Sequence, residues 1–198
     1  MKRAELFFFM FVIMGLFLLV SCNQSYTPKP RGYLRLDLPN HSYKTFDEAK
    51  NFSFEYPEYA VVEIDSSRPE AYDWYTIQFT SMKASLHLSY KKVNNNLPKL
   101  LEDAHTMAFK HLPKASGIAD SIFFIPEHQV EGLFYLISGK GVASPIQFYL
   151  TDTTRHFLRG ALYFNFLPNN DSVAPVIQHL KTDINHLVST FEWKPIQN

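Results

Sequence analysis

Residues 118–166, "IADSIFFIPEHQVEGLFYLISGKGVASPIQFYLTDTTRHFLRGALYFNF", decide the fold class. Four segments in this stretch are rich in β-branched, aromatic and aliphatic residues, as strands are: Ile118 to Ile125, Gln129 to Ser138, Pro145 to Thr151 and His156 to Phe166. Gly139-Lys140-Gly141 and Thr153-Thr154 mark turns between them. Short turns join antiparallel neighbours, so the stretch predicts strands linked as hairpins.

Three segments before this stretch alternate apolar and polar residues. They are "FSFEY" at 52–56, which stops at Pro57, "WYTIQFT" at 74–80 and "SLHLSYKKV" at 85–93. A period of two is typical of antiparallel strands with one buried face. We therefore expect Tyr75, Ile77 and Phe79 to point one way from the second segment.

Two segments have helical periodicity instead. The first has Asn96 as a candidate N-cap, Pro98 in the first turn and an apolar stripe that runs to Leu112. The second starts at Asn170-Asp171, has an apolar stripe to Phe191 and ends at Trp193 and Pro195. Strands, a helix, four strands and a helix predict an α+β fold: an antiparallel sheet of about six to seven strands with two main helices. This order resembles the Mog1/PsbP-type α-β-α sandwich.

The composition limits the function classes. The chain has 198 residues, 46% of them hydrophobic, which suits one domain with a core. Lys+Arg and Asp+Glu are equal at 19 each, so no basic excess favours nucleic acid as a partner. A single cysteine excludes an internal disulfide.

The N-terminus has the pattern of a bacterial lipoprotein. Lys2 and Arg3 precede the apolar run from Leu6 to Val20, which is shorter than the roughly twenty residues of a membrane-spanning helix. Leu19-Val20-Ser21-Cys22 matches a lipobox, whose cysteine receives the lipid. We predict that residues 1–21 are a removed signal peptide, that 22–32 hold the lipidated Cys22 and a Pro-rich tether, and that 33–198 form a single globular α+β domain. The alternative is an ordinary signal peptide or uncleaved anchor with an incidental cysteine.

The tether leads into an alternating segment. Pro28 and Pro30 favour an extended, polyproline-like chain, and Leu34, Leu36 and Leu38 then share one face of a short strand or extended arm. This segment is either a spacer or a docking epitope. The candidate partner-binding residues are Lys29, Arg31, Tyr33 and Arg35.

No catalytic constellation appears in the sequence. The chain has no nucleophile elbow and no His-Glu-x-x-His motif, and Ser138-Gly139-Lys140-Gly141 lacks the spacing of a phosphate-binding loop. His179, Asp183 and His186 share one side of the last helix, where two imidazoles and a carboxylate can bind a divalent metal. The alternative is a solvated helix face, and no fourth ligand is identifiable. We therefore predict no enzyme, no metal site and no cofactor.

Three triplets match a bacterial O-glycosylation pattern: Asp120-Ser121-Ile122, Asp152-Thr153-Thr154 and Asp171-Ser172-Val173. The alternative is turn and N-cap chemistry, which Asp-Ser and Asp-Thr pairs also supply.

The residues "SCNQSYTPKPRGYLRLDLP" at 21–39, followed by "FSFEYPEYAVVE" at 52–63, resemble the gliding-motility lipoprotein GldD family of Bacteroidetes. The resemblance is most specific in Tyr26 to Pro39. It implies a non-enzymatic accessory lipoprotein, anchored to the bilayer through acylated Cys22, that works with other envelope proteins in gliding and type IX secretion. It brings no catalytic residues. Asn23-Gln24-Ser25 lacks the acidic run that marks surface export in this phylum, so we expect a periplasm-facing domain, on the outer rather than the inner membrane.

Two function classes stay open. One is an interaction module with the arm as its docking segment, and a flat aromatic surface would favour it. The other is a periplasmic ligand-binding or weakly catalytic lipoprotein that uses a pocket in the sheet, and a deep polar pocket around histidines with shifted pKa values would favour that.

Overall fold

The computed structural model describes Phe8 and residues 36–64, 73–166 and 169–195. The chain divides into two units, Met1–Gly32 and Tyr33–Asn198, and the elements below all belong to the second. The predicted signal peptide, the tether and the residues Cys22, Lys29, Arg31, Tyr33 and Arg35 lie outside the described residues. Among the described residues, no helix has the length and apolar content needed to span a bilayer.

A seven-stranded antiparallel sheet dominates the described part of the chain, with the order β3-β4-β5-β9-β8-β7-β6. Its strands are β3 (Val61–Ile64), β4 (Trp74–Phe79), β5 (Ala84–Lys92), β6 (Gly117–Ile125), β7 (Val130–Ser138), β8 (Ile146–Thr151) and β9 (His156–Phe164). The four strands predicted from residues 118–166 form the meander β6-β7-β8-β9, as expected. β9 then pairs with β5 along nine residue pairs and so joins the two halves of the sheet.

A second, three-stranded sheet was not predicted. It consists of β1 (Tyr43–Phe46), β2 (Phe52–Pro57) and β10 (Glu192–Trp193), with β2 in the centre. The alternation at 52–56 identifies β2 as a strand but not the sheet to which it belongs. Residues 36–42 form no strand or helix, so the described part of the predicted arm belongs to neither sheet.

Among the described residues from 36 onward, the α-helices are α2 (Leu97–Phe109) and α3 (Ala174–Ser189), and short 3₁₀ helices occur at Thr80–Met82, Leu112–Lys114 and Pro126–His128. α2 begins after Asn96 as predicted, but the Asn96 side chain accepts the N–H of Asn94 at 2.8 Å and does not cap the helix. α3 begins four residues after the predicted Asn170, because the Asn170 amide instead donates to the carbonyl of Val142 at 3.2 Å.

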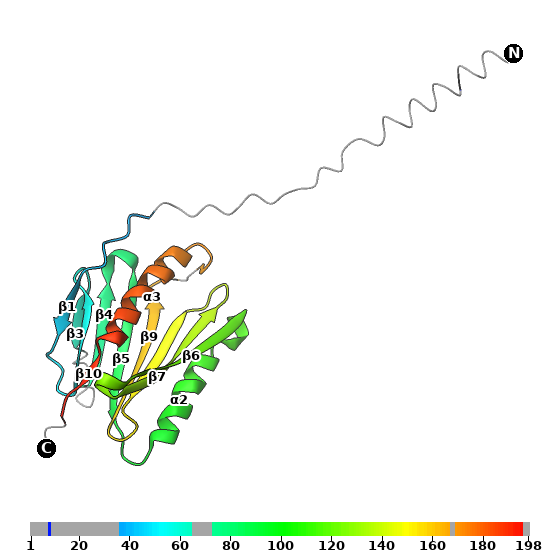
Figure 1. The fold of residues 1–198 in the computed structure, drawn as a ribbon. Helices are drawn as coiled ribbons and strands as arrows, with labels where there is room; N and C mark the ends of the chain where they lie inside the picture. Colours follow the sequence, from blue (N-terminus) through cyan, green and yellow to red (C-terminus); the bar gives the residue numbers. More distant parts are fainter. Residues whose placement is uncertain (1–7, 9–35, 65–72, 167–168, 196–198) are drawn as a thin grey trace. The chain divides into compact units, whose positions relative to one another are not determined.

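The helices cover opposite faces of the large sheet (Figure 1). Phe157 packs with Leu100 and Ala104 of α2, whereas its neighbour Leu158 belongs to the core shared with α3 and β2. Adjacent residues of a strand point to opposite faces, so the layers run α2, sheet, then α3 with the small sheet. The structure confirms the predicted α+β fold with an α-β-α arrangement.

α2 covers only part of its face. It contacts β8 and β9, and its buried residues are the small Ala104 and Ala108 together with Leu100. The same face of β3, β4 and β5 presents partly exposed or exposed side chains such as Trp74, Thr76 and His87. One half of this face is therefore open, and it borders the helix.

Candidate functional site

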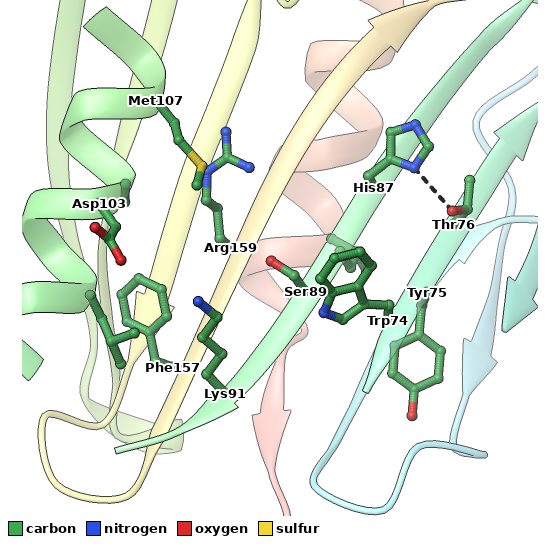
Figure 2. A pocket seen from close by; sticks show the side chains of 13 residues that line it. Trp74, Tyr75, Thr76, His87, Ser89, Lys91, Asp103, Met107, Phe157 and Arg159 are labelled. Carbon is green, nitrogen blue, oxygen red and sulfur yellow. Dashed lines mark hydrogen bonds between the residues drawn. The ribbon is translucent and has the colours of Figure 1, made fainter. Parts of the chain in front are cut away.

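A groove runs between α2 and the open half of the large sheet. Its volume is about 300 Å³, and residues from α2 and from strands β4, β5 and β9 line it. Figure 2 shows Met107 and Asp103 on the α2 side and Trp74, Ser89 and Lys91 on the strands. The groove exists because α2 is centred over β8 and β9 and does not reach β4.

The groove combines apolar and cationic groups. Trp74 and Met107 are both 39% exposed, although large apolar side chains are more often buried. The guanidinium of Arg159 also lines the groove, and its Nη2 donates to the buried Gln147 at 2.5 Å, which holds it against the sheet. Lys91 adds a second positive charge. Asp103 adds one carboxylate, so the two cations outnumber it by one. This mixture of an aromatic ring, a flexible thioether and an excess of positive charge suits a segment with apolar and acidic side chains.

The groove is not the polar histidine pocket that would favour catalysis. Burial lowers the pKa of His111, His156 and His179, and none of these three lines the groove. His87 does line it and lies 3.1 Å from the Thr76 hydroxyl on the exposed sheet face.

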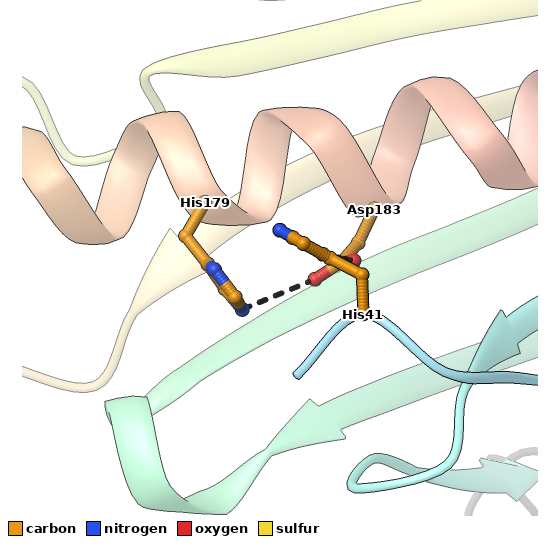
Figure 3. Close-up of side chains that lie close together, drawn as sticks. All are labelled: His41, His179 and Asp183. Carbon is orange, nitrogen blue, oxygen red and sulfur yellow. Dashed lines mark hydrogen bonds and ion pairs between the residues drawn. The ribbon is translucent and has the colours of Figure 1, made fainter. Parts of the chain in front are cut away.

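A second group of polar side chains lies on the opposite side of the sheet, where α3 meets the segment before β1 (Figure 3). Asp183 is 1% exposed, and its Oδ1 lies 2.6 Å from Nδ1 of His41. His179, one turn earlier on α3, has its Nε2 3.7 Å from the other carboxylate oxygen of Asp183. The rings of His41 and His179 stack with centroids 4.2 Å apart.

Two tyrosines orient the Asp183 carboxylate. The hydroxyl of Tyr43, on β1, donates to Oδ1 at 3.0 Å, and the hydroxyl of Tyr59, just after β2, donates to Oδ2. Burial and the hydrogen bond to Asp183 raise the pKa of Tyr43 to about 12, and the same causes raise that of Tyr59. Both hydroxyls therefore remain protonated donors at neutral pH.

The structure divides the predicted triad of α3. It brings His179 and Asp183 together but separates His186, whose Nε2 lies 2.7 Å from Glu55 and whose ring stacks on Tyr43 at 3.6 Å. A solvated helix face is the wrong interpretation for His179 and Asp183, because both are buried. Sequence reasoning missed His41, since no local pattern links it to a helix that begins more than 130 residues later.

The predicted glycosylation triplets have different surroundings. Ser121, Thr153 and Ser172 are all exposed. The Asp152 carboxylate accepts the N–H groups of Thr154, Arg155 and His156 at 3.0, 2.8 and 2.7 Å, which is the turn chemistry of the alternative interpretation. Burial acts to raise the pKa of Asp152, but these hydrogen bonds outweigh it and lower the pKa.

A family model of lipoproteins matches residues 23–193, which include every strand and helix described above, so the chain is an α+β lipoprotein of the bacterial envelope. That model is the one for gliding motility lipoprotein GldD. The chain belongs to the GldD family, as the resemblance at residues 21–39 and 52–63 indicates.

The solution structure of cyanobacterial PsbP (CyanoP) from Synechocystis sp. PCC 6803 is similar with a TM-score of 0.47 and 10% sequence identity, over 81% of this chain and 98% of that chain. No curated protein matches the chain.

Proposed function

We propose that this lipoprotein is a non-enzymatic accessory component of the cell envelope, which supports gliding motility and the associated type IX secretion through protein–protein interaction. Acyl chains on Cys22 anchor it, since each buried CH₂ contributes about 0.8 kcal/mol to membrane binding. The domain faces the periplasm, on the outer rather than the inner membrane. The family membership supports the gliding role, and the lipobox at 19–22 supports the anchor.

The observation that carries the interaction role is the open half of the large sheet with its groove beside α2. Aromatic residues, Met and Arg are enriched where proteins bind one another, and the groove presents Trp74, Met107 and Arg159 together. With Lys91 it favours a partner segment that carries an apolar side chain next to a carboxylate. The arm residues Lys29, Arg31, Tyr33 and Arg35 provide a second contact for the same partner.

The groove volume also favours one alternative. About 300 Å³ is at the lower end of the range of small-molecule sites, roughly 300 to 1,000 Å³. A periplasmic ligand-binding or weakly catalytic lipoprotein would use the same groove for a small anionic, partly apolar ligand. Recovery of such a molecule instead of a protein would support this alternative.

The deciding experiment is capture of the full lipoprotein from its native envelope after mild crosslinking. The groove variant combines Trp74→Ala with Lys91→Glu, and the matched control combines Leu112→Ala with Lys140→Glu, outside the groove. We expect the groove variant to lose the crosslinked partner and gliding, and the control to keep both. A third variant with Arg31→Glu and Arg35→Glu tests the arm separately. Retention of the same partners and of gliding by the groove variant would refute the groove as the docking surface.

A further inference from the structure

We propose that His41, His179 and Asp183 bind one divalent transition-metal ion, with zinc as the best match. This site differs from the docking groove and lies on the α3 side of the sheet. One imidazole nitrogen from each histidine and one oxygen of Asp183 all lie within 4.8 Å of one another. Two imidazoles and a carboxylate are a common ligand set for zinc with one coordination position left open.

The distance from His179 to Asp183 suits a shared metal better than a hydrogen bond. Two ligands about 2.1 Å from a tetrahedral ion are about 3.4 Å apart. The His179 Nε2 to Asp183 Oδ2 distance of 3.7 Å is close to this value, whereas it exceeds the length of a hydrogen bond. The 2.6 Å from His41 to Asp183 would lengthen on binding. The His41 side chain is 38% exposed and belongs to a segment outside any strand or helix.

His179 provides an independent indication. Its residue is 8% exposed, and its Nε2 has no hydrogen-bond partner among the described residues. Buried polar atoms without a partner are rare, because each one costs the free energy of its lost hydration. This nitrogen points at the Asp183 carboxylate without reaching it (Figure 3), so a cation between the two would satisfy both.

The surroundings of Asp183 are those of a metal-binding carboxylate. Tyr43 donates to one of its oxygens and Tyr59 to the other, so the carboxylate is fixed in orientation before any ion binds. Metal-binding carboxylates are usually held by hydrogen bonds of this kind, and these outer contacts affect metal affinity. The exposure of His41 leaves a path for the ion and for a water molecule as fourth ligand.

The ion would connect two distant parts of the domain. His41 belongs to the segment that follows the tether, whereas His179 and Asp183 belong to the last helix. A shared metal would fix the start of the described domain to α3. A metal bound only by the folded chain stabilises the fold by mass action.

The test uses the full chain, extracted in detergent, purified without a polyhistidine tag and stripped of metal with a chelator. Zinc is added in competition with a chromophoric chelator, and the melting temperature is measured with and without zinc. We expect one zinc ion per chain and a higher melting temperature with zinc. His41→Gln and His179→Gln should each weaken zinc binding by about tenfold or more and reduce the gain in melting temperature.

His105→Gln is the control, because His105 is an exposed histidine of α2, on the opposite face of the sheet from the site. It should bind zinc like the unaltered chain. His41→Gln changes a partly exposed side chain, and circular dichroism of each variant checks that it is folded. The proposal fails if the unaltered chain binds no stoichiometric zinc, if His41→Gln and His179→Gln bind it as tightly as the unaltered chain, or if His105→Gln weakens binding equally.

Discussion

His41 and Asp183 are 142 positions apart in the sequence, yet His41 Nδ1 lies 2.6 Å from Asp183 Oδ1. This contact joins the segment before β1 to the penultimate turns of α3 and buries a carboxylate almost completely. A buried carboxylate persists only where donors compensate for its lost hydration, and His41, Tyr43 and Tyr59 provide them here.

The first prediction concerns that carboxylate in the metal-free protein. Asp183→Ala removes the acceptor of Tyr43 and Tyr59, so the free energy of unfolding should fall by about 2 to 4 kcal/mol. Urea denaturation in the presence of a chelator measures the loss. Asn185→Ala, an exposed position on the same helix, is the control and should change stability by about 0.5 kcal/mol or less. Equal effects of the two substitutions would contradict the network described for Asp183.

The second prediction concerns the dependence of stability on pH. His156 is buried, its Nδ1 lies 2.8 Å from the Tyr90 hydroxyl, and its ring stacks on Trp193 with centroids 4.9 Å apart. Burial lowers the pKa of His156, against the opposing charge of Asp152. In the unfolded chain His156 therefore binds a proton near pH 6.5, whereas in the folded chain it binds one only at lower pH. The free energy of unfolding consequently falls as the pH drops below about 6.5.

Urea denaturation at pH 7.5 and at pH 5.5 tests whether the protein is less stable at the lower pH. Each such group contributes at most about 1.4 kcal/mol per pH unit, and His111 and His179, whose pKa values are also lowered by burial, act in the same direction. His156→Gln should reduce the difference in the free energy of unfolding between pH 7.5 and pH 5.5 without abolishing it. An unchanged difference in this variant would show that His156 is not responsible.

The third prediction concerns Gly160, on which the ring of Phe148 lies. A Cβ at Gly160 would lie 2.2 Å from the Phe148 Cζ, and Phe148 is itself buried in the core. Gly160→Ala should lower the free energy of unfolding by about 1 to 3 kcal/mol, because the ring must shift within a packed interior. Gly117→Ala is the matched control and should be nearly neutral, since no atom of the described residues beyond its two chain neighbours lies within 4 Å of a Cβ there. Thermal denaturation of both variants measures this difference. Similar melting temperatures would contradict the close contact between Gly160 and the Phe148 ring.

The fourth prediction concerns the close approach of α2 to the sheet. Ala108 is fully buried against Tyr135, Ile137 and Val142. Ala108→Leu adds three carbon atoms at this contact and should lower stability by about 1 to 3 kcal/mol. Met107→Leu, at the neighbouring exposed position, should have little effect. A neutral Ala108→Leu in urea denaturation would mean that α2 packs more loosely than described.

The fifth prediction concerns the anchor. Cys22→Ser removes the thiol that receives the lipid, so the protein should no longer incorporate labelled palmitate and should lose its stable attachment to the membrane fraction. Ser21→Ala keeps a small residue before the cysteine and should leave labelling unchanged. Continued labelling of the Cys22→Ser protein would show that the lipid is attached at another residue, and no labelling of the unaltered protein would refute lipidation.

Much of the fold was predictable because its signals are local. The alternation in "WYTIQFT" reports directly which side chains of β4 are buried, and Tyr75, Ile77 and Phe79 are buried as expected. The helical stripe of α3 likewise predicts its buried face. β1, β3 and β10 were missed because strands of four residues or fewer are too short for a period to emerge. β1 and β10 depend on pairing with β2, and β3 on pairing with β4.

The candidate sites divide in the same way. The sequence alone identified the lipobox pattern, the antiparallel strands, the two helices and the spacing of His179 and Asp183, because each is a pattern within a few turns or strands of chain. Only the tertiary structure decided that His41 joins those two residues, that His186 bonds to Glu55, and that α2 leaves half of a sheet face open. These relationships depend on contacts between segments far apart in the chain, and the free energy of such contacts depends on packing and burial that no local periodicity records.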